Sequence, residues 1–382
     1  MGQKTRKYLF YFGLLFLCVP FMQQSLEIVK VKPINGFLPP SPDATFNIEN
    51  WWNEQYQPEK TSYLNEHFGF RPALLRFNNQ IDYSIFNRVN SDWLLLSKGN
   101  CLFFQNELAD RAGLLFPGED SLRKKMMMVK AIQDTFAKMG KLMFIVYAPV
   151  KPVFYPEFIR EDSLPAITGR TNVDRYKRLG KLMGINQVDI GAWFYAMKNT
   201  RKELLFPKQG FHWSMYGSLL AEDSIIKYIE LQKQIVMPKP VLSNLIRTRI
   251  PRGSDDDARK LMNVMAQQGD EVYTYADVHY PRDSSLVKPS IMYIGDSYLL
   301  ELLTNKMMDS CNSSWVIWWN SQYISNIADP NDKSPKGMKT YDWIAGTKNM
   351  DCVVLLYTSW DLPRLGDGFV EKAYSYYYPK KD

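Results

Sequence analysis

The chain has 382 residues, with 47 Lys or Arg against 40 Asp or Glu, so its formal net charge is +7. Hydrophobic residues make up 46% and charged residues 23% of it, an ordinary globular composition that excludes collagen-like, low-complexity and intrinsically disordered chains. The basic residues are scattered beyond the N-terminus, so no nucleic-acid partner is predicted. Aromatic residues reach 14% of the chain, which fits either an aromatic-rich core or a sugar-binding surface.

Residues 1–24 form a targeting segment. Lys4, Arg6 and Lys7 precede an uncharged apolar stretch over residues 8–22. This stretch is long for a signal peptide and short of the roughly 20 residues of a full membrane span. Because no small-residue cleavage site follows, we expect a signal anchor with its basic end in the cytoplasm, with a cleaved signal peptide as the alternative. The remaining chain is then extracytoplasmic, in the periplasm or cell envelope, and anchored in the inner membrane.

Residues 25–115 read as a stalk and an N-terminal cap region. Their Pro-rich beginning is followed by an amphipathic stretch over residues 73–86 and by short apolar segments around a Gly turn at residues 98–99.

From residue 116 to 382 apolar strands alternate with helices. The strands are expected at residues 141–149, 185–190, 291–295, 315–319 and 351–358. The helices are expected at residues 120–139, 171–183, 214–229 and 298–308. This alternation predicts an α/β domain, in which helices cover both faces of a parallel sheet. Residues 231–289 separate two of these units and are interpreted as an insertion at the rim of the sheet.

The strand at residues 291–295 leads into Gly295, Asp296 and Ser297, and a helix follows. This places the Ser297 hydroxyl at the C-terminal edge of the sheet and at a helix N-terminus, where free N–H groups can stabilise an oxyanion. Gly295 allows close backbone approach. The same tripeptide is also a common turn in which Ser or Asp only caps the helix.

The chain contains three histidines, His67, His212 and His279. His212 stands between aromatic residues just before a predicted helix, where it could act as a general base or simply pack. With Ser297, it supplies the two side chains that acyl transfer needs at one edge of a sheet.

Metal and nucleotide cofactors are not predicted. The four cysteines lack the CxxC spacing of zinc sites, and the sequence has neither a Walker phosphate loop nor a GxGxxG fingerprint. Outside the targeting segment, Cys311 and Cys352 could form a disulfide, and the sequence leaves that pairing open.

Six motifs in order resemble the SGNH-hydrolase-like domain of the alginate and cell-surface polysaccharide O-acetyltransferases, over roughly residues 60–380. They are residues 66–71 (EHFGFR), 97–104 (SKGNCLFF), 148–151 (APVK), 155–157 (YPE), 212–217 (HWSMYG) and 295–297 (GDS). The resemblance implies an SGNH-hydrolase-like, flavodoxin-like sheet, a nucleophile at Ser297, a base at His212 and no cofactor. It also implies a membrane-bound O-acyltransferase as the partner that supplies the acyl group.

Family members usually carry an Asp two residues before this His, but here Gly210 occupies that position. The acidic member of the triad must then come from elsewhere. Asp189, at a strand end, and Asp223, on the following helix, are the candidates considered, and solvated or capping roles are the alternative for both.

Other residues are expected to support or line the site. Asp296, Gly295 and Asn320 are expected to support it, Asn320 as an oxyanion contact. The expected substrate-binding residues are Lys151, Trp213, Tyr298, Trp319 and Tyr323. Trp318 and Trp319 are adjacent on a strand and therefore point to opposite faces, so at least one of them is expected in the core.

The leading hypothesis is an extracytoplasmic O-acetyltransferase that modifies a cell-surface polysaccharide through a serine acyl-enzyme. An acetyl esterase that acts on the same polymer would use the same groups, with water as the acceptor. A glycan-binding scaffold with impaired catalysis is the third hypothesis, and it rests on Gly210.

Overall fold

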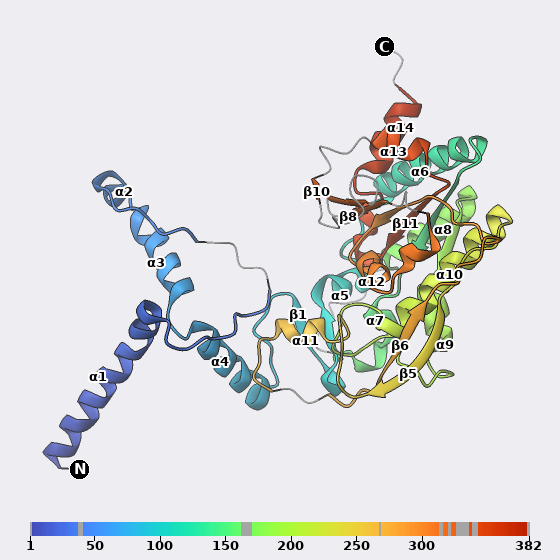
Figure 1. The fold of residues 1–382 in the computed structure, drawn as a ribbon. Coiled ribbons are helices and arrows are strands. Elements are labelled where there is room, and N and C mark those ends of the chain that lie inside the picture. Colours follow the sequence, from blue (N-terminus) through green and yellow to red (C-terminus); the bar gives the residue numbers. More distant parts are fainter. Residues whose placement is uncertain are drawn as a thin grey trace. The chain divides into compact units, whose positions relative to one another are not determined.

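The computed structural model describes residues 2–36, 41–161, 170–266, 269–312, 316–319, 322–325, 336–337 and 343–379. The chain divides into two compact units (Figure 1). One comprises residues 1–91 and 259–268, and the other residues 92–258 and 269–382.

The first unit is helical. Its helices are α1 (Gln3–Leu26), α2 (Ile48–Trp52), α3 (Tyr56–His67) and α4 (Arg71–Phe86). By length and composition α1 could cross a membrane, a test that a signal sequence near the N-terminus also passes. The amphipathic helix expected at residues 73–86 is α4.

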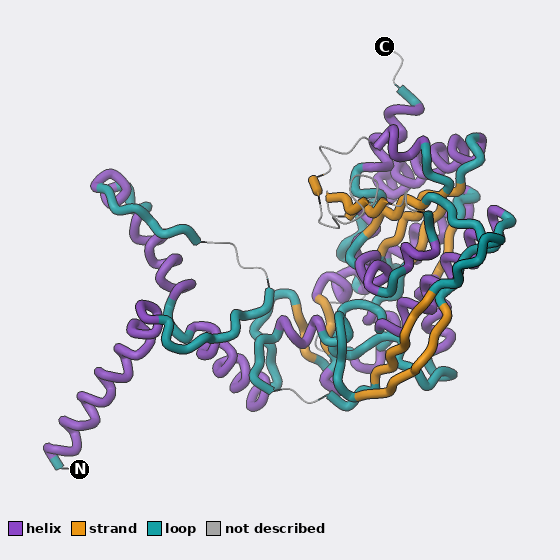
Figure 2. Tube along the Cα trace, in the orientation of Figure 1, coloured by secondary structure: helices purple, strands orange, loops and turns teal. Residues whose placement is uncertain are grey.

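The second unit contains a seven-stranded sheet in the order β10-β9-β8-β7-β11-β3-β4. Its strands are β3 (Leu142–Tyr147), β4 (Gln187–Asp189), β7 (Ile291–Gly295), β8 (Val316–Trp319), β9 (Gln322–Ser325), β10 (Lys336–Gly337) and β11 (Cys352–Tyr357). The strands from β8 to β4 run parallel, whereas β9 and β10 add antiparallel pairs at one edge. The α/β prediction is confirmed, and each strand it named overlaps a strand of this sheet (Figure 2).

Helices cover both faces of the sheet. Those of this unit are α5 (Gln105–Arg111), α6 (Glu119–Lys138), α7 (Lys151–Phe154), α8 (Asn172–Met183), α9 (Ile190–Met197), α10 (Met215–Lys233), α12 (Tyr298–Thr304), α13 (Trp343–Lys348) and α14 (Phe369–Tyr377). In β3, Phe144 and Val146 enter the core that includes residues of α10 and α12, whereas Met143 and Ile145 enter the core that includes residues of α6 and α14. The continuous apolar run of β3 thus fills two cores, as expected for a buried parallel strand.

The predicted insertion has more structure than its sequence indicates. It contains an antiparallel pair, β5 (Val241–Thr248) and β6 (Tyr273–His279), and the short helix α11 (Asp257–Leu261) between them. β5 is largely exposed and mixes apolar with polar residues, so it lacks the continuous apolar run that marks the buried strands.

The short apolar segments before the sheet form the antiparallel pair of β1 (Leu94–Leu96) and β2 (Leu102–Phe104). The compact unit begins at Asp92, so this pair and α5 belong with the sheet. Cys311 and Cys352 are both buried free thiols, not a disulfide.

Candidate active site

The nucleophile candidate, Ser297, lies in the turn between β7 and α12. A Cβ atom on Gly295 would lie 2.0 Å from the Leu356 carbonyl oxygen of the neighbouring strand β11. Only glycine fits this close approach of β7 to β11. The chain turns directly after Gly295, and the partly exposed side chain of Ser297 lies at the C-terminal edge of the sheet.

Ser297 and His212 are hydrogen-bonded. The Oγ atom of Ser297 lies 2.8 Å from Nε2 of His212, although the two residues are 85 positions apart in the chain. On the other side of the ring, Nδ1 of His212 lies 2.7 Å from Oδ2 of Asp257. This geometry fits a neutral imidazole that donates its Nδ1–H to Asp257 and accepts the hydroxyl proton of Ser297 at Nε2.

The carboxylate hydrogen-bonded to His212 is that of Asp257, whereas both acids considered from the sequence pair with lysines. Asp189 pairs with Lys177 at 2.5 Å, and Asp223 pairs with Lys227 at 2.5 Å on α10. Asp257 is instead the first residue of α11, inside the insertion.

The family model described as the SGNH hydrolase-like domain of the acetyltransferase AlgX matches residues 94–298, more than half of the chain. The chain belongs to this AlgX-type family. The predicted family, its SGNH-hydrolase-like fold and an acyltransferase-type enzyme are thereby confirmed.

The chain is also similar to three solved structures. The O-acetyltransferase domain of Pseudomonas putida AlgJ is 12% identical with a TM-score of 0.46, and the match covers 74% of this chain and 99% of that one. Pseudomonas aeruginosa AlgX is 12% identical with a TM-score of 0.45, covering 76% and 71%. Bacillus cereus PatB1 is 10% identical with a TM-score of 0.42, covering 71% and 97%. No curated protein sequence matches significantly.

In this AlgX-type domain the segment that carries the acid is held from several sides. Asp255 accepts hydrogen bonds from the Met215 N–H at 2.9 Å and from the Tyr275 hydroxyl at 2.7 Å. The hydroxyl of Ser254 donates to Glu301 on α12 at 2.5 Å. The start of α10, strand β6 and the nucleophile helix therefore all fix the position of Asp257.

The same segment explains why position 210 is glycine. A Cβ atom there would lie 3.0 Å from the carbonyl oxygens of both Ser254 and Asp255 and 2.8 Å from the Pro207 side chain. The insertion thus occupies the space next to Gly210 and brings its own carboxylate to the histidine.

Negative charge surrounds the imidazole. His212 keeps 14% of its side chain exposed, and Oε1 of Glu301 lies 4.0 Å from Nδ1, beyond the hydrogen-bonded Asp257. Burial lowers the pKa of His212. The hydrogen bond and charge of Asp257, and then the charges of Glu301 and Asp296, raise it by more, so the pKa lies above its ordinary value of 6.5. The site therefore favours the imidazolium that forms when Ser297 loses its proton.

Asp296 supports the turn, as the sequence led us to expect. Its Oδ2 accepts hydrogen bonds from the Thr358 N–H at 2.6 Å and hydroxyl at 2.7 Å, and its Oδ1 accepts one from the Tyr298 N–H at 3.1 Å. Burial raises the pKa of Asp296, although these hydrogen bonds oppose the rise. This carboxylate fastens the nucleophile turn to the end of β11.

Tyr298 and Trp213, expected to bind substrate, pack behind the histidine. Tyr298 is 4% exposed, and its hydroxyl donates to the Phe211 carbonyl at 2.9 Å. Its ring meets the His212 ring edge-to-face at 5.0 Å and the Trp213 ring at 4.9 Å. Trp213 is fully buried. Tyr298 therefore packs against the imidazole, and Trp213 packs against Tyr298.

Lys151, also expected to bind substrate, is an internal cation. Its side chain is buried, and its Nζ donates to the carbonyl oxygens of Leu102 at 2.8 Å, Lys208 at 3.1 Å and Gly210. An ammonium has three N–H donors, so all of them are used inside the domain. Lys151 therefore shapes the backbone just before His212.

Two of the remaining expected residues, Trp319 and Tyr323, lie on the β8–β9 pair. Trp319 is half-buried and pairs with Gln322 across the strands, whereas Tyr323 is largely buried opposite Trp318, which is in the core. Asn320 lies outside the described residues.

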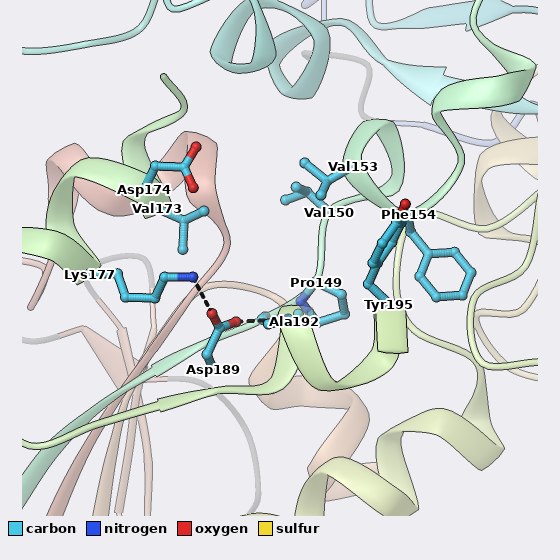
Figure 3. A pocket seen from close by; sticks show the side chains of 12 residues that line it. Pro149, Val150, Val153, Phe154, Val173, Asp174, Lys177, Asp189, Ala192 and Tyr195 are labelled. Carbon is cyan, nitrogen blue, oxygen red and sulfur yellow. Dashed lines mark hydrogen bonds and ion pairs between the residues drawn. The ribbon is translucent and has the colours of Figure 1, made fainter. Parts of the chain in front are cut away.

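A separate cavity of about 220 Å³ opens where β3 and β4 end (Figure 3). It is lined by Ala148, Pro149, Val150, Val153, Phe154, Val173, Asp174, Lys177, Asp189, Gly191, Ala192 and Tyr195. Neither Ser297 nor His212 lines it. Asp189, one of the candidate acids, lies here, where its carboxylate binds Lys177 and the Ala192 N–H.

Sequence reasoning missed Asp257 and Glu301. The run Asp255–Asp257 is visible in the sequence, but nothing local links it to a histidine 45 positions away. Glu301 was detectable, because it stands four residues after Ser297 on a predicted helix and so lies on the same helix face.

Proposed function

We propose that the protein transfers an acetyl group to a hydroxyl of an extracytoplasmic polysaccharide through an acyl-enzyme on Ser297. Membership of the AlgX-type acetyltransferase family supports acetyl transfer. The observation that carries the serine mechanism is the continuous hydrogen-bonded chain from Ser297 through His212 to Asp257.

In the first step, Oγ of Ser297 attacks the carbonyl carbon of an acyl ester or thioester donor as its proton passes to Nε2 of His212. The tetrahedral intermediate collapses, the donor's carbon–oxygen or carbon–sulfur bond breaks, and His212 returns the proton to the leaving group. In the second step a sugar hydroxyl gives its proton to His212 and attacks the ester. The new sugar ester forms, and the proton returns to Ser297.

A donor for the oxyanion is available in the nucleophile turn. The Ser297 backbone N–H makes no hydrogen bond with any described residue, and it belongs to the residue whose Oγ attacks. A hydrogen bond from such an N–H stabilises a developing oxyanion more strongly than it stabilises a neutral carbonyl oxygen.

A second candidate function, an acetyl esterase, would use the same groups with water as acceptor. The scaffold hypothesis has lost its basis, since it rested on the missing acid at Gly210 and Asp257 supplies a carboxylate. We favour transfer over hydrolysis because the family is one of acetyltransferases.

The extracytoplasmic location is part of the proposal. It is supported by the apolar helix α1 with basic residues at its start, which suits a signal anchor or a signal peptide. A membrane-bound O-acyltransferase partner, implied by the family resemblance, would supply the acyl group, and the polysaccharide would be the acceptor.

The test uses the full chain in detergent and an activated acetyl ester. We expect Ser297-dependent acetate release and an acetylated protein detectable by intact mass, both lost in Ser297→Ala. Ser285→Ala, which removes an exposed hydroxyl that donates to Asp283, is the matched control and should behave as the parent. Equal turnover by Ser297→Ala and the parent would refute the serine mechanism.

A further inference from the structure

Three aromatic side chains gather around Phe104, next to the triad. The Phe104 ring lies 6.0 Å from that of Trp93 in a nearly parallel arrangement, 5.6 Å from that of Phe211 and 5.3 Å from that of Trp360. We call Trp93, Phe104, Phe211 and Trp360 the aromatic platform. They come from the β1–β2 pair, from the loop before α10 and from the turn after β11.

Phe211 links the platform directly to the triad, because it is the residue before His212. Its N–H donates to Oδ1 of Asp257 at 2.6 Å, and its carbonyl accepts the hydroxyl of Tyr298 at 2.9 Å. Its backbone is therefore fixed by the triad acid on one side and by the nucleophile helix on the other.

The other platform segments are also tied to the site. Trp360 follows Thr358, whose N–H and hydroxyl bind Asp296 beside the nucleophile. Strand β2, which ends at Phe104, is held through Leu102. The Leu102 N–H donates to the Lys208 carbonyl at 2.9 Å, and the Leu102 carbonyl accepts from Lys151. The rings thus sit on segments fastened to the catalytic groups.

The platform differs from core packing in its exposure. Trp213, one residue beyond the histidine, is fully buried, whereas Trp93 is 62% exposed. Phe104, Phe211 and Trp360 are each half-buried. Rings that served only to close a core would be shielded from water, but all four of these remain open to it.

We propose that the aromatic platform binds a sugar ring of the acceptor polysaccharide and so presents a hydroxyl to the acyl-enzyme. This inference rests on the proposed function and extends it. A pyranose ring has an apolar C–H face that packs on an aromatic ring while its hydroxyls stay at the edge, open to polar contacts and to attack on the ester.

The position of the platform favours an acceptor sugar as its ligand. An acceptor must approach Ser297 from the solvent side, and the exposed rings lie beside His212, which deprotonates that acceptor.

The test measures how the acyl-enzyme partitions. The full chain in detergent is supplied with the activated acetyl ester and a panel of neutral and uronic-acid hexasaccharides, and transfer to sugar is compared with transfer to water. Trp93→Ala and Trp360→Ala should each lower the ratio of transfer to hydrolysis about tenfold, equivalent to ~1.4 kcal/mol. Trp93→Phe should recover most of the ratio.

Tyr376→Ala is the matched control, because Tyr376 is 47% exposed on α14, outside the platform. An unchanged ratio of transfer to hydrolysis in both Trp variants would overturn the inference. A rise in KM for the ester alone would also overturn it, because the platform would then bind the donor. Transfer to no hexasaccharide would also overturn it, whereas Ser297-dependent acetate release would still support the acyl-enzyme. Loss of that release would refute the proposed function itself.

Discussion

The carbonyl oxygen of Asp255 lies 3.0 Å from the position that a Cβ atom on Gly210 would occupy. The resemblance places the triad acid on residue 210, and here the backbone of the insertion fills that space. Two residues further along the same segment, Asp257 reaches the imidazole at 2.7 Å. The insertion therefore both requires glycine at residue 210 and supplies the Asp257 carboxylate that contacts His212.

Asp257→Asn should lower kcat for acetate release by about three to four orders of magnitude, because the imidazole loses the partner that fixes its tautomer. The KM for the ester should change little. Steady-state kinetics on the full chain check this result, and Asp223→Asn on α10, which loses only a surface ion pair, should keep parental rates. A fall of less than tenfold in Asp257→Asn would contradict the assignment of the acid.

Gly210→Asp should not restore the activity of Asp257→Asn. An aspartate at residue 210 meets the carbonyl oxygens of Ser254 and Asp255 before it can reach His212, and two carbonyl oxygens repel a carboxylate. In the parent background the same substitution should lower the thermal midpoint and kcat together. Recovery of the double variant to near-parental kcat would show that the insertion is dispensable.

The pH profile should reflect the charges around the histidine. His212 must be neutral to accept a proton, and its pKa is raised, so kcat/KM should rise with pH and reach half of its plateau above pH 6.5. Glu301→Gln removes one of the raising charges but keeps an acceptor for Ser254. The midpoint should therefore move to lower pH, as measured by acetate release across a buffered series.

Glu203→Gln is the control for that series, because Glu203 pairs with Arg247 outside the triad. Its midpoint should match the parent. A midpoint of Glu301→Gln that stays in place or moves upward would exclude Glu301 from the electrostatics of the histidine.

Lys151→Met should destabilise the fold. It leaves three carbonyl oxygens without their charged donor, at a cost of about 3 kcal/mol or more in the free energy of unfolding. Lys227→Met, on a side chain that is 62% exposed, should cost little. Denaturant titration of both variants gives the comparison. A stable Lys151→Met protein with a raised KM for the hexasaccharides would instead support direct contact with substrate.

The parallel strands could be predicted because each of them carries its own signal. A buried strand such as β3 is a continuous apolar run, and the turn after β7 has a recognisable Gly-Asp-Ser sequence. Ser297 and His212 were named from such local patterns, and the structure brings the two together at 2.8 Å.

The rest depends on contacts between distant segments. The exposed strand β5 pairs with β6 across an intervening helix, and the insertion that they form carries Asp257 to His212. Lys151 was misjudged for a related reason. A lysine normally faces water, and here three carbonyl oxygens accept hydrogen bonds from its Nζ and offset the cost of burial.

The placement of the acid on the insertion also affects how related genes are interpreted. A motif search that demands aspartate two residues before the histidine would class a chain like this one as a degenerate enzyme. Under the mechanism proposed above, glycine at that position followed by an acidic run in a downstream insertion would instead mark a triad whose acid lies on another segment. Genomes that encode such pairs are where further active members with a relocated carboxylate should be sought.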